Sequence, residues 1–264
     1  MRLFTILFAA AMALGQPALT QSALTAMHTA DDSRGWQGVG RLNLGDTGFC
    51  TAALVTSTVV ITAAHCLYYK HDGTPIPLDQ IEFQAGLRHG RAEAYRGVRR
   101  AVLHPDYSFV GHNQLDRVGN DLALVELDQP IRKPGIKPYR TQLTVDVGQT
   151  VQVVSYAKDR EDAPSLEPAC SVLTRDADVM VLSCEVDFGA SGAPIFIEQN
   201  GERRIVSVVS AKAEWQQRPV ALAAVMEGEL SRLIEAYHNS TNGRTVGALR
   251  TDTQRSGNAR FVRP

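Results

Sequence analysis

Three short segments of the chain carry side chains whose types together suit acyl transfer. Ser191 lies in residues 189–194 (GASGAP), His65 in residues 62–66 (TAAHC) and Asp121 in residues 120–124 (NDLAL). A serine hydroxyl becomes an effective nucleophile when an imidazole takes its proton and a carboxylate holds that imidazole in the right tautomer. The sequence therefore predicts Ser191 as nucleophile, His65 as base and Asp121 as the group that orients His65.

The residues around Ser191 favour the same chemistry. Gly189 has no Cβ to crowd an approaching carbonyl group, so the backbone can come close to a substrate there. We expect the N–H groups of Gly189 and Ser191 to form an oxyanion hole, which stabilises the negative charge that develops on the attacked oxygen. Peptide hydrolysis is the reaction that this arrangement suits best.

Each of these residues also has an ordinary structural interpretation. Ser191 stands in a small-residue segment typical of a turn, Asp121 can cap a turn, and Asp116 is a competing carboxylate nearby. Asp121 begins an apolar run, where an unpaired buried carboxylate is costly, and this favours a partner such as His65. The three motifs together make catalysis the preferred interpretation.

The charge composition bears on possible partners. The 264 residues include 27 basic and 28 acidic side chains, which gives a formal net charge of -1. This balance provides no electrostatic reason to expect nucleic acid or an anionic membrane as a partner. The length suffices for one large all-β unit or two small ones.

Residues 1–15 have the pattern of an export signal. Arg2 is followed by a run that is apolar apart from Thr5, and residues 13–15 (ALG) form a small-x-small cleavage site. The run is too short to span a membrane, which needs about 20 apolar residues. We expect cleavage after Gly15 or a few residues later, no membrane anchor afterwards, and a secreted or periplasmic protein.

Four cysteines behind an export signal predict two disulfides. The sequence permits three pairings, of which the local one joins Cys50 to Cys66 and Cys170 to Cys184. Each bridge closes a loop of about 15 residues and stabilises the fold by roughly 3 kcal/mol. No Cys-x-x-Cys or His-x-x-x-His spacing is present, so we expect no metal site.

The remaining pattern is that of an all-β chain. Short runs rich in Val, Leu, Ile and Thr, separated by turn residues, predict strands over residues 39–44, 50–55, 58–62, 81–86, 95–103, 121–127, 150–156, 171–173, 179–184, 193–198, 205–211 and 221–225. Only residues 227–238 have helical spacing, with apolar side chains at three and four residues.

With these motifs, the chain resembles the chymotrypsin-like (trypsin-like) serine proteases from about residue 39 to the closing helix. The motifs follow the order histidine, aspartate, serine, which is that family's order. The resemblance implies catalysis without a cofactor on a polypeptide substrate, with His65, Asp121 and Ser191 as the triad. It also places a disulfide beside the histidine, where Cys50 and Cys66 lie. We expect a monomer.

The resemblance further implies a fold of two antiparallel six-stranded β-barrels with a C-terminal helix. Residues 36–135 form the barrel that carries His65 and Asp121, and residues 136–241 form the barrel that carries Ser191, with the closing helix. Residues 16–35 are expected to be a flexible segment. Residues 242–264 are a polar tail with five arginines and are expected to be disordered.

One departure from the family concerns Ala190. Animal trypsins carry an aspartate immediately before the serine, which pairs with the new N-terminus released on activation. Ala190 cannot form this ion pair, so the chain looks closer to bacterial secreted members such as the glutamyl endopeptidase group, which also lack that aspartate. The segment around Ser191 must then be ordered in another way.

Substrate preference is assigned by position alone. Glu185 stands six residues before Ser191, where trypsins have the aspartate that binds a basic side chain, and Asp187 is the alternative. Residues 205–210 correspond to the strand that lines the pocket, with Ser207 and Ser210 as its polar side chains. Glutamyl enzymes have a histidine there and this chain has none, so we expect cleavage after Arg or Lys.

Two other functions fit the same motifs. A protease-like binding protein without turnover is one, because nothing obvious replaces the ion pair that Ala190 cannot make. A serine esterase with the same triad is the other, and it differs in hydrolysing esters without cleaving peptides.

Overall fold

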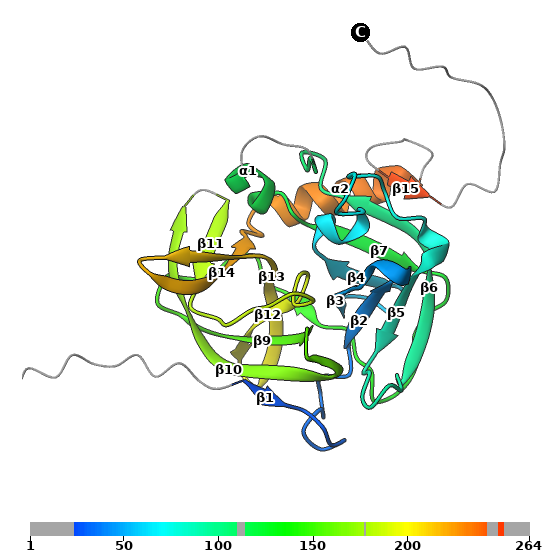
Figure 1. Cartoon of the computed structure of the whole chain (residues 1–264), viewed down its shortest axis with the longest axis horizontal. Helices are drawn as coiled ribbons and strands as arrows, with labels where there is room; N and C mark the ends of the chain where they lie inside the picture. Colours follow the sequence, from blue (N-terminus) through cyan, green and yellow to red (C-terminus); the bar gives the residue numbers. More distant parts are fainter. Residues whose placement is uncertain (1–23, 110–113, 177, 242–247, 251–264) are drawn as a thin grey trace, which may run out of the picture.

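The computed structural model describes residues 24–109, 114–176, 178–241 and 248–250, and its strands form two barrels that lie side by side (Figure 1). The expected all-β fold of two barrels with a C-terminal helix is confirmed. The predicted export signal, residues 1–15, lies outside the described residues.

In the N-terminal barrel, each strand pairs antiparallel with its neighbours and β6 closes the ring by pairing with both β5 and β7. In order around the ring, the strands are β2 (Val39–Leu44), β3 (Phe49–Leu54), β4 (Val59–Thr62), β7 (Ala123–Leu127), β6 (Ala94–Leu103) and β5 (Ile81–Ala85). The backbone of β15 (Ala248–Arg250) pairs antiparallel with β6 at residues 100–102, beyond the part of β6 that pairs with β5.

In the C-terminal barrel, the ring closes through the pairing of β9 with both β10 and β12. In order, its strands are β9 (Thr150–Ala157), β10 (Arg160–Asp176), β11 (Val179–Leu182), β14 (Arg218–Ala224), β13 (Glu202–Trp215) and β12 (Pro194–Gln199). Two short strands lie outside the ring: β1 (Thr25–Ala26) pairs with β10, and β8 (Arg140–Thr141) runs parallel to β13.

The barrels are joined by a shared apolar core. Ile61 of β4 and Leu124 of β7 belong to the same buried cluster as Phe196 of β12, Val208 of β13 and Leu233 of helix α2 (Glu229–Thr241). The strands β4 and β7 are buried along their whole length, because one face lines their own barrel and the other faces this core. The relative position of the two barrels is therefore fixed by packing.

Helix α2 follows the C-terminal barrel in sequence but lies against β6 and β7 of the N-terminal barrel (Figure 1). The guanidinium of Arg100 lies over the Tyr237 ring at 4.1 Å and donates a hydrogen bond to Ser240 Oγ at 2.8 Å. The sequence assigned this helix to the C-terminal unit, and the structure shows that it also packs against the other barrel.

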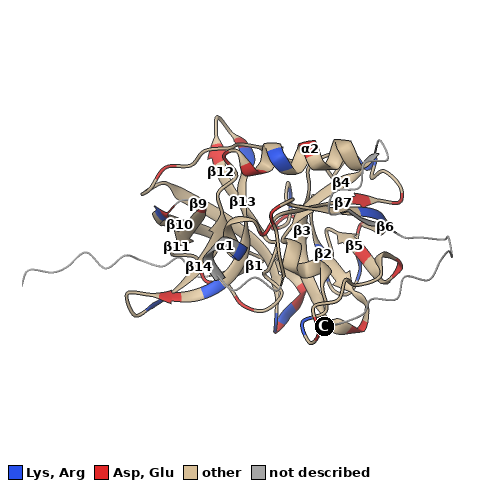
Figure 2. Cartoon of the chain, turned by 90° about the horizontal axis from the view of Figure 1, so that it is seen from above, with Lys and Arg blue, Asp and Glu red and all other residues tan. Residues whose placement is uncertain are grey.

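Two disulfides are present, and they follow the local pairing. Cys50 at the start of β3 is bonded to Cys66, and Cys170 of β10 is bonded to Cys184. Charged residues of both signs are spread over the loops and strand ends of both barrels (Figure 2). Among the described residues, no helix has the length and apolarity that crossing a membrane requires.

Three segments differ from the sequence-based expectations. Residues 24–35 are not structureless, because β1 pairs with β10 and the side chain of Met27 is only 2% exposed. In the tail, expected to be disordered over residues 242–264, residues 248–250 form β15, while 242–247 and 251–264 lie outside the described residues. A short helix, α1 (Gln114–Gly119), precedes Asp121 and was not expected.

Candidate active site

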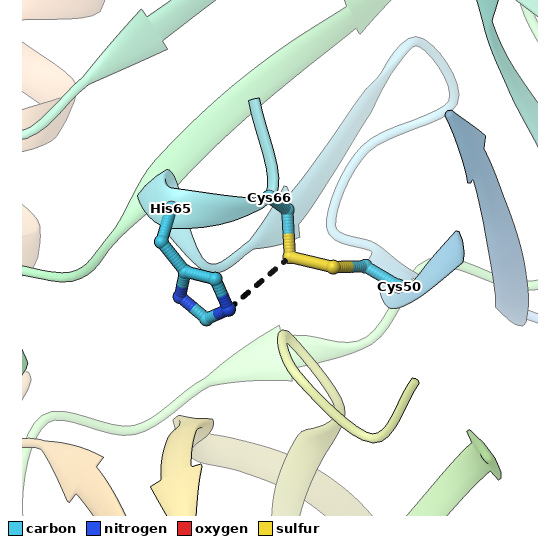
Figure 3. Close-up of side chains that lie close together, drawn as sticks. All are labelled: Cys50, His65 and Cys66. Carbon is cyan, nitrogen blue, oxygen red and sulfur yellow. Dashed lines mark hydrogen bonds between the residues drawn. A yellow bond between two sulfur atoms is a disulfide. The ribbon is translucent and has the colours of Figure 1, made fainter. Parts of the chain in front are cut away.

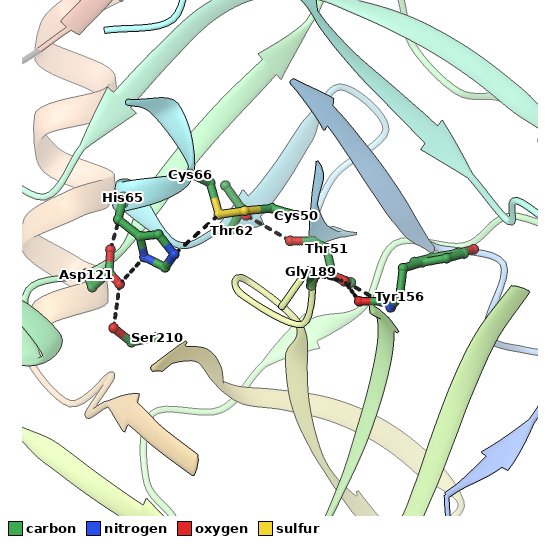
Figure 4. Close-up of a disulfide and its surroundings, with 9 residues drawn as sticks. All are labelled: Cys50, Thr51, Thr62, His65, Cys66, Asp121, Tyr156, Gly189 and Ser210. Atoms are coloured by element: carbon green, nitrogen blue, oxygen red, sulfur yellow. Dashed lines mark hydrogen bonds and ion pairs between the residues drawn. A yellow bond between two sulfur atoms is a disulfide. The ribbon is translucent and has the colours of Figure 1, made fainter. Parts of the chain in front are cut away.

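The ends of β4 and β7 bring His65 and Asp121 together. In this pair of strands, Thr62 lies opposite Ala123. His65 comes three residues after the end of β4 and Asp121 two residues before the start of β7, so the two meet at this end of the strand pair. His65 lies in a 3-10 turn, Ala64–Leu67, and its backbone N–H donates to Asp121 Oδ1 at 2.8 Å. His65 Nδ1 lies 2.6 Å from Asp121 Oδ2 (Figure 4). This pairing assigns the proton to Nδ1 and leaves Nε2 as the acceptor.

Ser210 contributes a third hydrogen bond to the same carboxylate. Its hydroxyl, from β13 of the other barrel, donates to Asp121 Oδ2 at 2.5 Å (Figure 4). Asp121 is only 2% exposed, and three donors offset the cost of burying its charge. The sequence assigned Ser210 to substrate specificity; in the structure its hydroxyl orients the carboxylate that orients His65.

The Cys50–Cys66 disulfide lies beside the imidazole. His65 Nε2 is 4.0 Å from Cys66 Sγ (Figure 3). Two groups of nearby potential metal ligands, Cys50 with His65 and Cys66, and Glu167 with Cys170 and Cys184, each contain a disulfide. A metal needs a thiolate sulfur, so these sulfurs do not serve as its ligands.

Ser191 lies in a tight turn between β11 and β12 that packs directly against the segment before His65. A Cβ added to Gly192, which has φ +75°, would lie 2.1 Å from Thr62 Oγ1 and 2.9 Å from the Ala63 nitrogen. Only glycine permits this approach. Ser191 and His65 line the same two cavities.

Ser191 and His65 line the same cavity, but among the described residues no hydrogen bond joins their side chains. Among the contacts of these residues, the neighbour of His65 Nε2 is the disulfide sulfur of Cys66. Catalytic hydrogen bonds without substrate are often long and shorten in the complex.

Backbone hydrogen bonds fix the orientation of the Phe188–Gly189 and Ala190–Ser191 peptide groups. The Phe188 carbonyl accepts from the Lys158 N–H at 2.7 Å, and the Ala190 carbonyl accepts from the Ala193 N–H at 2.9 Å. In a trans peptide the N–H points opposite to the carbonyl, so the N–H groups of Gly189 and Ser191 point away from these partners. Within the described part of the chain, neither donates to a protein acceptor.

The main cavity of the site has a volume of about 300 Å³. Its wall includes His65, Asp121, Ser191 and Ser210, together with Asp187 and Lys212. Asp187 and Lys212 form an ion pair at 2.9 Å. The hydrogen bonds from Lys212 and from the Phe188 N–H lower the pKa of Asp187.

Two predicted specificity residues lie outside this cavity. Glu185 is exposed and does not line it, and its backbone N–H donates to Glu167 Oε2 at 2.8 Å. Ser207 is fully buried and its hydroxyl donates to the Ala224 carbonyl. Asp187, the alternative to Glu185, lines the cavity. The sequence analysis did not identify Lys212 as a residue of the cavity. Its position two residues after Ser210 is the feature of the sequence that could have indicated it.

Glu167 is a buried carboxyl directly behind the loop that carries Glu185. Its side chain is 0% exposed, and Oε1 has no partner among the described residues. Burial raises the pKa of the Glu167 carboxyl to about 7, although the Glu185 N–H acts in the opposite direction. Nothing in the sequence distinguished this glutamate from the exposed ones.

Comparison with known proteins assigns the family. The family model for trypsin matches residues 26–221. The chain belongs to the trypsin family. Serine protease 23 of Bos taurus is 26% identical over 188 residues, covering 61% of this chain and 48% of that protein. A trypsin of Phaedon cochleariae is 31% identical over 84 residues, covering 31% of this chain and 29% of that protein.

A solved structure shares the fold of this trypsin-family chain. The structure of a Glu endopeptidase in complex with MPD superposes with a TM-score of 0.65 at 15% identity, over 82% of this chain and 97% of that one. This likeness concerns the fold alone. The chain spans about half the length of the serine protease 23 relatives it matches.

Proposed function

We propose that this chain is a serine endopeptidase that works through an acyl-enzyme intermediate. His65 Nε2 takes the proton from Ser191 Oγ, which attacks the peptide carbonyl carbon, and the N–H groups of Gly189 and Ser191 bind the oxyanion. His65 then gives the proton to the leaving amine, and water hydrolyses the acyl-enzyme with His65 again as base. Asp121 stabilises the imidazolium that forms in each step.

The observation that carries this proposal is the pairing of His65 with Asp121. Asp121 Oδ2 lies 2.6 Å from Nδ1 and accepts a further hydrogen bond from Ser210. This fixes the tautomer, so Nε2 is the nitrogen left to accept a proton, and His65 lines the cavity that Ser191 also lines. Family membership supports a peptide substrate.

The test is the variant Ser191→Ala of the mature protein. We expect it to abolish both labelling by a fluorophosphonate and cleavage of a casein substrate, with an unchanged circular dichroism spectrum. Ser231→Ala on the exposed face of α2 is the matched control and keeps both. Labelling that persists in Ser191→Ala removes Ser191 from the mechanism, and ester hydrolysis without peptide cleavage favours the esterase. Wild-type protein that is neither labelled nor active favours the protease-like binding protein.

A preference for Arg or Lys depends on Asp187 in this proposal, since Glu185 does not line the cavity. Lys212 already pairs with Asp187, so we expect only a weak preference. A panel of peptide esters with Arg, Phe or Glu at the cleaved position measures it. If Asp187→Asn leaves the ranking of the three esters unchanged, Asp187 does not determine specificity.

The predicted export signal and two disulfides support a secreted or periplasmic location. The closer resemblance to bacterial secreted members remains a prediction from Ala190. Amino-terminal sequencing of the exported protein tests whether the export signal is cleaved. We expect the mature chain to start just after Gly15.

A further inference from the structure

The oxyanion hole depends on a loop that has no charged side chain at position 190 to hold it. This oxyanion loop, residues 187–191, includes Gly189 with φ +95° and the fully buried, uncharged Ala190. Glycine adopts many backbone conformations at little cost. A rotation at Gly189 would turn the N–H groups near it away from the cleft, and a hydrogen bond to the Gly189 carbonyl would resist this rotation.

Thr51, on β3 of the opposite barrel, provides that contact. Its backbone N–H donates to the Ser191 carbonyl at 2.8 Å, and its hydroxyl donates to the Gly189 carbonyl at 2.9 Å (Figure 4). The same hydroxyl oxygen accepts from the Tyr156 N–H at 3.0 Å. One residue of the N-terminal barrel therefore holds two carbonyls of the oxyanion loop and one strand of the C-terminal barrel.

The hydroxyl proton has one preferred acceptor. The Gly189 carbonyl is closer than the Tyr156 carbonyl, which lies at 3.3 Å, and a hydroxyl donates only one hydrogen bond. Thr51 is 0% exposed, so water does not replace a lost partner. A hydrogen bond in this dry position has few alternatives and restricts the Gly189 carbonyl strongly.

Packing leaves the loop little room on either side of this bond. A Cβ at Gly189 would lie 2.3 Å from the Phe49 ring and 3.1 Å from Ala157 Cα. Phe49 comes from the same strand as Thr51, so one strand supplies both an apolar wall and a hydrogen-bond donor. The wall limits displacement of Gly189, and the hydroxyl limits its rotation.

We propose that Thr51 is a positioning residue that holds the oxyanion loop in its active orientation through its side-chain hydroxyl, in the place of a charged contact at position 190. The inference rests on the proposed function, since it concerns the same oxyanion hole. It goes further by assigning the order of the loop to the opposite barrel.

The first test compares Thr51→Val, which keeps the shape and removes the hydroxyl, with Thr51→Ser, which keeps the hydroxyl. For p-nitrophenyl acetate we expect Thr51→Val to lower kcat by about 10- to 100-fold, less than the loss of an oxyanion donor itself. KM should change by less than about twofold, because the bond acts on the transition state. Thr51→Ser should recover most of kcat. Ser33→Ala, which removes another buried hydroxyl bonded to a carbonyl, should keep it.

The second test does not require activity. Amide hydrogen exchange followed by mass spectrometry should show faster exchange over residues 186–193 in Thr51→Val and an unchanged rate in Ser33→Ala. If Thr51→Val has the same kcat and the same exchange rates as the wild-type protein, the inference is overturned. It is also overturned if Thr51→Ser loses as much kcat as Thr51→Val does. If the wild-type protein hydrolyses no ester and is not labelled at Ser191, the proposed function fails, and the exchange rates alone then decide whether Thr51 holds the loop.

Discussion

Replacing the buried Glu167 by glutamine should remove part of the pH dependence of stability. The Glu167 side chain is 0% exposed, and Oε1 lacks a partner among the described residues. Burial raises the pKa of its carboxyl from 4.5 to about 7 in the folded protein. The folded state therefore binds a proton at this site that the unfolded state releases between these two pH values.

The sign and the size follow from this difference. A carboxyl whose pKa is higher in the folded state stabilises the fold at low pH, and that stability is lost as the pH rises through about 7. The change from 4.5 to about 7 corresponds to about 3 kcal/mol, since a tenfold change in an equilibrium constant is worth about 1.4 kcal/mol. Glutamine resembles the neutral carboxyl and does not ionise, so the variant does not lose this stability at high pH.

The assay is urea unfolding of the disulfide-intact protein at pH 4 and pH 8. We expect the difference in unfolding free energy, Glu167→Gln minus wild type, to increase by about 3 kcal/mol between the two pH values. Glu198→Gln, at an exposed position of β12, is the control and should show no such increase. A difference that is constant with pH would refute the reasoning, because Glu167 would then be ionised to the same extent in both states.

Three further variants test other parts of the structure. Asp121→Asn should lower kcat for an activated ester by about 10⁴-fold, because the wrong tautomer of His65 is stabilised; a loss below tenfold would contradict the role of this carboxylate. Gly192→Ala should abolish ester hydrolysis, since its Cβ would lie 2.1 Å from the hydroxyl oxygen at the end of β4, whereas Gly148→Ala, also at positive φ but with open space around it, should keep activity. Replacing both Cys170 and Cys184 by serine should reduce the unfolding free energy by roughly 3 kcal/mol in urea, and an unchanged midpoint would show that this bridge contributes nothing.

Strands with a regular alternation could be predicted closely from the sequence. The run over residues 39–44 became β2 with the same bounds, because its buried positions alternate and a glycine and an aspartate follow it. The long strand β10 was recognised only in its last part, since Pro164 and Pro168 interrupt the pattern. Its pairing with β9 shifts register in two places, which accommodates these residues.

The residues of the proposed site that lie in short local motifs could be predicted from the sequence. His65 and Asp121 carry such motifs, and the structure brings them into contact. The roles of Ser210 and Thr51 could not be predicted, because they depend on partners 89 and 138 residues away in sequence. For the same reason the sequence could not show that Glu185 lies outside the cavity, because the direction of a loop side chain depends on how the whole loop is held.

The path of the C-terminal helix has a consequence for synthesis of the protein. Leu230 and Leu233 of α2 share a buried cluster with β4 and β7, and these strands precede the helix by more than a hundred residues. While the polypeptide is being made, the barrel that holds His65 keeps part of its apolar surface uncovered until Leu230 and Leu233 have been synthesised. The two halves of the proposed catalytic apparatus thus gain their shared core only after the segment that forms α2 has been made.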